Sequence, residues 1–524
     1  MPSEDYPNGA NDRFRILAAP VFYLSQNLIS LVGVVLATSL FFTMVVFYVA
    51  GFYGLSSNPY LGIVGYLILP GVFLVGLILI PVGIALKHQR EVRNQTLPEK
   101  YPKVDFNSPH VRRVFNFVVL VTVLNSMVFI HGSYKGVQYM DSVTFCGQVC
   151  HTVMHPEFTA YKNSPHSRVE CVSCHIGPGA SWFVRSKLSG VGQVIAVTLN
   201  SYPRPIPTPI KNLRPARETC EQCHWPSKFS GSLLAIRPKY ANDEANTATK
   251  NVLMLKVGGG NSAGAGIHGT HLDMARQITY LATDRERQRI PWVLYTSAAG
   301  QATEYATPDW DGDKSKGELR TMDCMDCHNR PTHVFQLPEQ ALNEALASGR
   351  IASSLPFVKK KAVELLKQPY PTQAAGAESI SRSLIAYYRD TYPQVWSQQR
   401  EAVERAAQAV QEIYQRNVFP EMKINWGTYP NNIGHESFPG CFRCHDGNHS
   451  SKDGNSISQD CTSCHLLLAV EESNPKILQE LSRFRQDDPA LRANWAAPFP
   501  EYMRLESNSP LLAALTRQWM DRPR

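Results

Sequence analysis

The chain has 524 residues and a mass of 58.6 kDa, with 44% hydrophobic residues, 18% charged residues, 12 cysteines and a formal net charge of +8. Its mean hydropathy of −0.22 averages two different parts. Residues 16–86 contain no Asp, Glu, Lys or Arg, whereas the chain after His131 is polar, proline-rich and holds every cysteine. This distribution excludes both a purely soluble and a mostly membrane-embedded protein. The basic residues are scattered and form no stripe interleaved with aromatics, so nucleic acid is not an expected partner.

Residues 1–26 are interpreted as an N-terminal tail, and residues 27–132 as a membrane anchor of three helices. About 20 apolar residues cross a bilayer as a helix, so the uncharged run is too long for one span. The polar turn at 56–59 divides it into helices near 27–52 and 61–86. A third apolar run, 114–130, predicts a third helix.

The loop at 87–113 sets the orientation of this anchor. It carries seven Lys and Arg residues against three acidic ones, while the turn at 53–60 carries none. Positively charged loops stay in the cytoplasm, so the N-terminus and this loop are predicted there, and all that follows the third span on the outer side. A cleavable signal peptide is the alternative for the first span, but its apolar stretch is too long and a second span follows at once.

The cysteines form six pairs, and each pair is followed immediately by a histidine. The six motifs are Cys146/Cys150–His151, Cys171/Cys174–His175, Cys220/Cys223–His224, Cys324/Cys327–His328, Cys441/Cys444–His445 and Cys461/Cys464–His465. Five of them read C-x-x-C-H, the attachment signature of c-type haem. The first has one extra residue and reads C-x-x-x-C-H.

This spacing has a chemical reason. Two thiols one short turn apart reach the two vinyl groups of one porphyrin, and the adjacent histidine then ligates the iron. Structural zinc, short disulfides and thioredoxin-like chemistry give no reason for an unvarying histidine after every pair. The sequence therefore predicts six covalently bound haem c groups. Such attachment takes place outside the bacterial inner membrane, which is where the charge pattern puts all six motifs.

Seven histidines lie outside the motifs and beyond the membrane part, and six irons need at most six distal ligands. The candidate ligands are His155, His166, His268, His271, His333, His435 and His449. Ligation by two histidines gives closed, low-potential irons suited to passing electrons. For the first haem, Met154 could supply a thioether ligand in place of a nitrogen, because it lies three residues beyond His151.

The run 146–187 resembles the membrane-anchored quinol dehydrogenases of the NapC/NirT/NrfH family. The resemblance covers roughly residues 115–230 and is carried by Met154 after the first motif, Glu157-Phe-Thr-Ala-Tyr161, Ser164-Pro-His166, the second motif and Lys187. It implies oxidation of menaquinol or ubiquinol at the first haem and electron transfer to periplasmic cytochromes or a reductase. By the same resemblance, His166 is a distal ligand and Lys187 belongs to the quinol pocket.

Two departures from the family pattern concern that pocket. The family's methionine lies two residues after the motif histidine, whereas Met154 lies three after. Where the family has an acidic residue about two turns past the lysine, this chain offers only Gln193. Met154, Lys187 and Gln193 are the candidate quinol-site residues. The three spans and six motifs are most similar in layout to the larger inner-membrane multihaem cytochromes of metal-respiring bacteria.

The expected fold is thus a membrane-anchored multihaem cytochrome c with a mostly helical, loop-rich periplasmic domain and a small β insertion. Short β-like runs at 251–257, 277–281 and 291–295 predict the insertion, and helical periodicity extends over 355–416, expected to pack over the haems. The organisation expected after the anchor is 133–230 with haems 1–3, 231–335 with haem 4, a helical segment 336–420, and 421–524 with haems 5–6 and the tail.

The leading function is an inner-membrane quinol dehydrogenase, anchored in the lipid bilayer, that takes electrons from the quinol pool and relays them through periplasmic haems to a downstream acceptor. One alternative is an electron-transfer subunit of a larger respiratory or photosynthetic complex, in a homo- or hetero-oligomer. Another is a terminal reductase of nitrite or sulfur compounds, which needs an open iron. Such enzymes often carry lysine in place of a motif histidine, and this sequence has no C-x-x-C-K.

Overall fold

The structure is a computed structural model of the whole chain. It describes residues 19–52, 69–98, 101, 107–149, 151–177, 179–210, 213–225, 231–258, 266–272, 277–487 and 502–505. The chain divides into two compact units, where the sequence suggested six segments. The first unit holds Met1–Cys146 with Ile176–Ser189, and the second holds Gly147–His175 with Gly190–Arg524.

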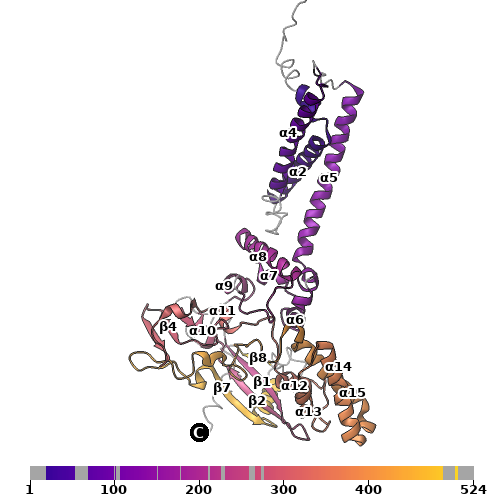
Figure 1. Cartoon of the computed structure of the whole chain (residues 1–524). Helices are drawn as coiled ribbons and strands as arrows, with labels where there is room; N and C mark the ends of the chain where they lie inside the picture. The colour runs from indigo at the N-terminus through magenta and orange to yellow at the C-terminus, as the bar shows by residue number, and fades with distance from the viewer. Residues whose placement is uncertain are drawn as a thin grey trace, which may run out of the picture. The chain divides into compact units, whose positions relative to one another are not determined.

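The first unit is built on three long apolar helices, drawn side by side in Figure 1: α2 (Leu28–Phe52), α4 (Leu69–Arg93) and α5 (Pro109–Asp141). Each is long and apolar enough to cross a membrane, which confirms the three predicted spans. Two boundaries differ from the prediction. Helix α4 continues past Leu86 to Arg93, and α5 continues past Ile130 to Asp141. Residues 61–68 lie outside the described residues.

Small and hydroxyl residues join these helices. A Cβ atom on Gly33 of α2 would lie 2.8 Å from the Gly76 carbonyl oxygen of α4, so the two backbones touch. Ser30 donates a hydrogen bond to the Ile80 carbonyl (2.9 Å), and the Thr38 and Thr122 hydroxyls bond between α2 and α5 (2.8 Å). Close backbone approach and interhelical hydrogen bonds replace the hydrophobic effect in a lipid environment.

The second unit contains two antiparallel four-stranded sheets. The first has the order β7–β2–β1–β8, with β1 at Ser232–Tyr240, β2 at Ala248–Leu255, β7 at His465–Glu472 and β8 at Tyr502–Leu505. The second has the order β5–β4–β3–β6, with β3 at Gln277–Ala282, β4 at Trp292–Thr296, β5 at Ala302–Ala306 and β6 at Glu318–Thr321. All three predicted β runs are strands.

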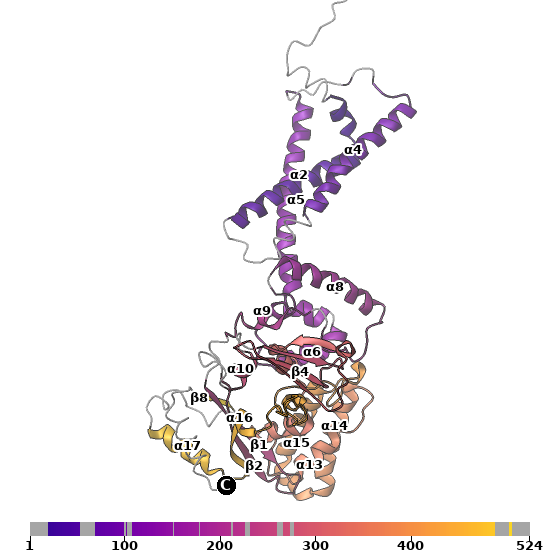
Figure 2. The same ribbon diagram turned by 90° about the vertical axis from the view of Figure 1, so that its left-hand side faces the viewer.

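The first sheet differs from the predicted insertion because it draws strands from the C-terminal part. In register, Leu253 of β2 pairs with both Ala235 and Leu467. Helix α17 (Lys476–Asp487) packs Ile477 and Leu481 against this sheet, and Figure 2 shows it beside β8. Strands β1 and β2 of the predicted β-containing segment 231–335 thus share a sheet with β7 and β8.

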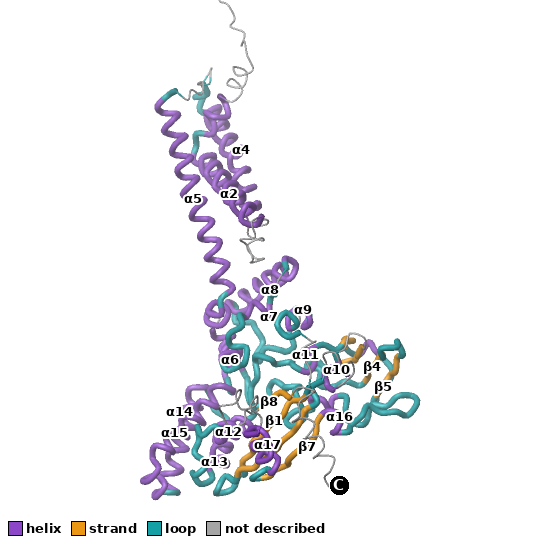
Figure 3. The backbone as a smooth tube through the Cα atoms, turned by 180° about the vertical axis from the view of Figure 1, so that it is seen from behind, coloured by secondary structure: helices purple, strands orange, loops and turns teal. Residues whose placement is uncertain are grey.

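Four helices of the second unit, α12 (Pro338–Ala347), α13 (Val358–Leu366), α14 (Gln373–Thr391) and α15 (Pro393–Asn417), form their own cluster, visible in Figure 3. Leu342, Leu384 and Val410 are fully buried within it. The predicted apolar faces of α13 and α15 are confirmed, but they pack against neighbouring helices of the cluster.

Apart from α6 (His151–Lys162) and α8 (Ala180–Thr198), the remaining elements are short. They are η2 (Phe145–Val149), α7 (Cys171–His175), α9 (Ala216–Cys220), α10 (Gly266–His271), η4 (Lys314–Lys316), α11 (Cys324–Cys327), η5 (Pro420–Met422), η6 (Gly440–Arg443) and α16 (Cys461–Cys464).

Candidate functional site

The C-x-x-C-H motifs are local turns of the chain. In the third to sixth motifs, the backbone N–H of the histidine donates to the carbonyl of the first cysteine. An aspartate caps the turn in two of them: Asp323 accepts from Met325 N (2.8 Å), and Asp460 accepts from Thr462 N (2.9 Å). Aspartate is a favoured N-cap because its side chain satisfies a free backbone N–H. The turn keeps the two cysteines and the histidine of each motif together.

Cys223 of the third motif and Cys444 of the fifth lie in the turn that follows the short helix of their motif. Helix α9 ends at Cys220, so Cys223 lies in the turn that follows, whereas Cys174, Cys327 and Cys464 lie within α7, α11 and α16. The Cys223 backbone N–H donates to the Cys220 carbonyl (3.1 Å), which keeps the two residues one turn apart. Cys223 is exposed, whereas Cys220 is half-buried. Its attachment to haem 3 therefore stays a prediction from the spacing.

Exposure differs among the other motif cysteines as well. The described motif cysteines form no disulfide. The exposed cysteines are Cys174, Cys223, Cys441 and Cys461. Thioether formation requires that a vinyl group can reach the thiol, so exposure is compatible with attachment.

Five motif histidines each face a second histidine from elsewhere in the second unit. The pairs and their ring-centroid separations are His175–His333 (6.2 Å), His224–His166 (5.9 Å), His328–His268 (6.3 Å), His445–His271 (5.9 Å) and His465–His435 (6.1 Å). All five partners are among the seven candidate distal ligands.

These separations fit one metal ion between each pair of rings. A metal–imidazole bond is about 2 Å long and the ring centre lies about 1 Å beyond the nitrogen, so two imidazoles on opposite sides of one iron are about 6 Å apart. Stacked histidines without an iron between them would come closer, as His435 does to the Phe442 ring at 4.2 Å. The second to sixth motifs therefore fit haem c with two histidine ligands.

Hydrogen bonds orient several of these rings. The Nδ1 atoms of His166, His271 and His445 bond to the carbonyls of Pro331 (3.3 Å), Ile267 (2.7 Å) and Ser458 (2.7 Å) respectively. His333 Nδ1 bonds to the Glu157 carbonyl (3.0 Å). A metal-bound histidine typically donates its other ring N–H in this way, which fixes the tautomer and leaves Nε2 for the metal.

Burial favours the neutral form of several of these imidazole rings. Desolvation lowers the pKa of His271, His333 and His465, and the facing histidine of each pair lowers it further for His271 and His465. Neutral imidazole is the form that binds a metal, so these environments suit iron ligands.

Two of the seven candidates lie in different settings. His449 is buried, with Nδ1 bonded to Asp446 Oδ1 (2.8 Å) and Nε2 bonded to the Ile290 carbonyl (2.7 Å). Although burial tends to raise the pKa of Asp446, hydrogen bonds from His449 and Asn448 lower it. Both nitrogens of His449 are thus engaged by the protein. His155 on α6 lies edge-on to the Phe419 ring, with centroids 5.2 Å apart.

Consecutive motifs of the second unit are neighbours in space. Helix α9 of the third motif contacts both α7 of the second and α11 of the fourth. The thiols of Cys220 and Cys324 lie close together. Cys327 of the fourth motif lies near Cys441 of the fifth, and Cys464 of the sixth also lies near Cys441. The motifs therefore follow one another in chain order, from the second to the sixth.

A buried polar network joins the fourth and fifth motifs. Arg443, inside the fifth motif, donates to the carbonyl of Asp326, inside the fourth (2.6 Å). The Asp326 carboxylate accepts from the Tyr280 hydroxyl (2.5 Å) and lies 3.5 Å from Arg320. Burial raises the pKa of Tyr280, and the neighbouring Asp326 raises it further, so the phenol stays protonated. This network fixes the two motifs relative to each other.

Comparison with known proteins agrees with this geometry. The model of the NapC/NirT cytochrome c family, N-terminal region, matches residues 108–205. The chain is 42% identical over 452 residues to the cytochrome c-type protein ImcH of Geobacter sulfurreducens, a match that covers 86% of this chain and 89% of that protein. The chain belongs to the NapC/NirT family of c-type cytochromes. No solved structure matches it.

Membership of the NapC/NirT family, together with three membrane-competent helices, identifies a multi-pass protein of the bacterial inner membrane. Proteins of this family are membrane multihaem cytochromes that transfer electrons through covalently bound haem c. The resemblance inferred from the sequence is thereby confirmed.

The residues of the family's first haem are only partly described. Cys146 lies in η2 of the first unit, Cys150 is outside the described residues, and His151 begins α6, where its side chain is not described. Met154 is a half-buried residue of α6. No distal ligand for the first motif follows from these residues.

Lys187 and Gln193 both belong to α8. An α-helix turns by about 100° per residue, so positions six apart leave the helix about 120° apart. The Lys187 side chain is not among the described ones, and Gln193 is exposed. The helix itself is notable for an exposed apolar face, because Leu188, Val191 and Ile195 are 68%, 58% and 54% exposed. Position 187 directly precedes this run, about one turn before Val191.

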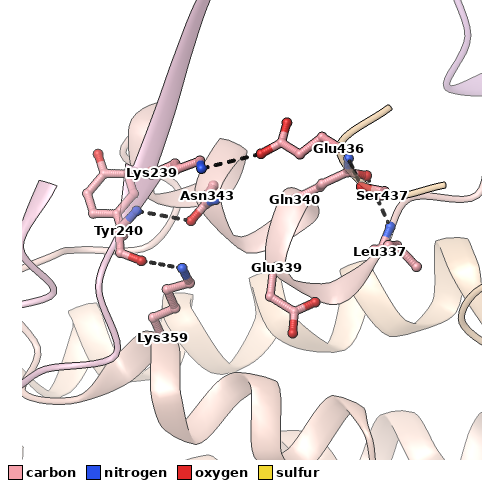
Figure 4. Close-up of a pocket in the computed structure, with 9 residues that line it drawn as sticks. All are labelled: Lys239, Tyr240, Leu337, Glu339, Gln340, Asn343, Lys359, Glu436 and Ser437. Carbon is pink, nitrogen blue, oxygen red and sulfur yellow. Dashed lines mark hydrogen bonds and ion pairs between the residues drawn. The ribbon is translucent and has the colours of Figure 1, made fainter. Parts of the chain in front are cut away.

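A cavity of about 450 Å³ lies elsewhere in the second unit (Figure 4). It is lined by Lys239, Tyr240, Leu337, Glu339, Gln340, Asn343, Lys359, Glu436 and Ser437. Lys239 pairs with Glu436 (3.5 Å), and Lys359 donates to the Tyr240 carbonyl. Its charged lining is unsuited to an apolar quinol, and it contains none of the predicted site residues.

Proposed function

We propose that this cytochrome binds six haems, oxidises quinol at its first haem and relays the electrons through the second to sixth haems to a periplasmic acceptor. The single observation that carries the relay is the set of five facing histidine pairs in motifs that succeed one another in space. Haem c, when bound, supplies one-electron redox chemistry. The chain's own residues attach the haems, ligate each iron from both sides and hold the haems in chain order.

The proposed ligand set follows from the same pairs. His175, His224, His328, His445 and His465 are the proximal ligands of haems 2–6, and His333, His166, His268, His271 and His435 are their distal ligands. His151 is the proximal ligand of haem 1, with Met154 or His155 as its candidate second ligand. His449 is left out of this set, because both of its nitrogens already bond to protein groups.

The apolar face of α8 supports a quinol site near Lys187. Quinol is dissolved in the lipid phase, and a contiguous exposed apolar face is the usual mark of a contact with lipid or an apolar ligand. In this proposal Lys187 holds the quinol hydroxyl and assists its deprotonation. Gln193 is a further polar residue of the helix that could contact the quinol head group.

Haem counting tests the first part of the proposal. The intact mass of the purified protein should exceed that of the chain by six haems, and the Cys146→Ser/Cys150→Ser variant should lose one of them. The Cys220→Ser/Cys223→Ser variant should likewise lose haem 3. A mass showing five haems in the wild type would limit the proposal to the five C-x-x-C-H motifs.

Quinol oxidation is tested by following haem reduction with a menaquinol analogue. Lys187→Leu should slow this reduction at least about tenfold, because general acid–base assistance contributes about 10²–10⁴-fold, while dithionite still reduces every haem. Arg185→Leu, which removes a positive charge from the same helix, is the matched control. Its haems should be reduced by the menaquinol analogue at the wild-type rate. If quinol reduces no haem in the wild type, the chain accepts electrons from a protein partner, as a subunit of a larger complex would.

A further inference from the structure

The outer nitrogen of one proposed ligand histidine, His333, lies beside a carboxylate. His333 Nδ1 lies 3.1 Å from the Glu157 carboxylate oxygen Oε2, in addition to its bond with the Glu157 carbonyl. The corresponding nitrogens of His166, His271 and His445 bond to neutral backbone carbonyls. His333 thus combines a ligand position with a carboxylate neighbour.

Arg330 completes the arrangement. Its Nη2 lies 3.2 Å from Glu157 Oε2 and 3.3 Å from Oε1, and its Nε donates to the His333 carbonyl (2.7 Å). The guanidinium stacks over the Tyr429 ring at 4.3 Å and is only 8% exposed. The carboxylate therefore sits between a fixed positive charge and the ligand imidazole, and solvent screens neither contact strongly.

These contacts affect the electron density of the His333 imidazole ring. A carboxylate that accepts the Nδ1–H bond makes the imidazole more basic and a stronger electron donor. A stronger donor favours the ferric over the ferrous iron and lowers the reduction potential. Arg330 acts in the opposite direction, because it draws the negative charge of Glu157 away from His333.

We propose that Glu157 and Arg330 are positioning residues that set the reduction potential of haem 2 through His333. This proposal rests on the ligand pair His175–His333 assigned above. It assigns to Glu157 of α6 a function beyond packing: the carboxylate lowers the potential of haem 2, and the arginine limits that effect.

The test uses two variants with opposite expected signs. Glu157→Gln keeps a hydrogen-bond acceptor and removes the charge, so the potential of one haem should rise, with about a tenfold change in its ferrous-to-ferric ratio at fixed potential, or about 59 mV for one electron. In Arg330→Gln, the Glu157 carboxylate loses its ion pair with Arg330 and interacts with His333 alone. The reduction potential of the same haem should therefore fall. Redox titration of the full-length protein, followed by absorption and EPR, resolves the affected centre.

Two controls separate this effect from general disturbance. Glu378 and Arg382 form an exposed ion pair on α14, at 75% and 70% side-chain exposure, and Glu378→Gln with Arg382→Gln should move no potential. Arg330→Lys keeps the positive charge and should stay near the wild type. Where Arg330→Gln fails to fold, the rise in potential expected for Glu157→Gln carries the test.

His333→Met distinguishes a wrong ligand pair from wrong tuning. In this variant one haem should gain a thioether ligand. The absorption spectrum should then show the sulfur-to-iron charge-transfer band of methionine-ligated haem. If His333→Met leaves every haem unchanged, the ligand assignment itself is wrong. If it changes one haem but Glu157→Gln and Arg330→Gln leave all potentials in place, or shift them in the same direction, Glu157 and Arg330 have only a structural role.

Discussion

His268 and His328 face each other with their imidazole planes only 9° apart, whereas the planes of His166 and His224 are 77° apart. The relative orientation of two axial imidazoles determines how far the iron d orbitals that interact with the rings split in energy. Parallel rings act on the same orbital and split the pair widely, while perpendicular rings act on one orbital each. The two haems should therefore differ in their spectra although their ligands are chemically identical.

The ferric protein should accordingly show two classes of low-spin EPR signal. Haem 4, with nearly parallel rings, should give a rhombic signal, together with haem 6, whose rings are 27° apart. Haem 3, with nearly perpendicular rings, should give a strongly anisotropic one. His268→Ala should remove part of the rhombic signal, and His166→Ala part of the anisotropic one, each replaced by a high-spin signal at unchanged haem content. Loss of the same component in both variants would contradict the assigned pairs.

A second pair of variants separates a ligand from a structural histidine. His271→Ala should convert one haem to the high-spin form, because His271 faces His445 at 5.9 Å. His449→Ala should leave every haem low-spin. It should instead reduce stability by about 1–3 kcal/mol, since the Ile290 carbonyl and the Asp446 carboxylate lose a buried partner. A high-spin haem in His449→Ala, seen by absorption or EPR, would show that His449 ligates iron.

This contrast illustrates what the sequence could and could not predict. Each C-x-x-C-H motif is a local turn, so the proposed attachment sites follow directly from the cysteine spacing, although the spacing does not reveal that α9 ends before Cys223. A distal ligand is a non-local choice: His175 and His333 are 158 residues apart, and nothing in the spacing joins them. His449 was a candidate ligand because it is one of the seven histidines that lie outside the motifs and the membrane part. Only the folded chain shows that it bonds to Ile290 of a distant segment.

The same reasoning applies to the fold. Apolar runs and helical periodicity are local patterns, and they correctly predicted three spans, three strands and the helical region after Leu355. The first sheet was underestimated because two of its strands, β7 and β8, come from beyond residue 464. Strand pairing over such a distance depends on which surfaces meet in the folded chain.

The stability of the protein should depend on pH through Lys359, which lines the cavity shown in Figure 4. Burial lowers its pKa below the ordinary 10.5, the Glu339 carboxylate opposes this effect and Lys239 adds to it. The folded protein therefore releases this proton at a lower pH than the unfolded chain does. Between the two pKa values the unfolded chain binds more protons, so this residue increases stability as pH rises toward 10.5.

Lys359→Met removes that contribution. The melting temperature of the wild type relative to the variant should therefore increase between neutral pH and pH 10.5, measured by calorimetry. Lys360→Met, which changes an exposed lysine of the same helix, is the control. A difference between wild type and Lys359→Met that stays constant over this range would show that burial does not perturb Lys359.

Helix packing in the anchor gives the last prediction. A Cβ atom on Gly76 would lie 2.9 Å from the Ala37 nitrogen and 3.2 Å from the Gly33 carbonyl oxygen, both backbone atoms that cannot move aside alone. Gly76→Leu should thus force α4 away from α2, with an overpacking cost of about 1–3 kcal/mol. The detergent-solubilised variant should melt or be cleaved by protease at a lower temperature, with unchanged haem content.

Gly71→Leu is the matched control for that substitution. It adds the same side chain to the same helix, but a Cβ atom at Gly71 has no other atom within 4 Å. The two variants raise the hydropathy of α4 equally, so membrane insertion alone cannot separate them. If both proteins are as stable as the wild type, α2 and α4 do not pack through Gly76. Destabilisation of Gly76→Leu alone would support a helix contact made by small residues, as expected where lipid supplies no hydrophobic driving force.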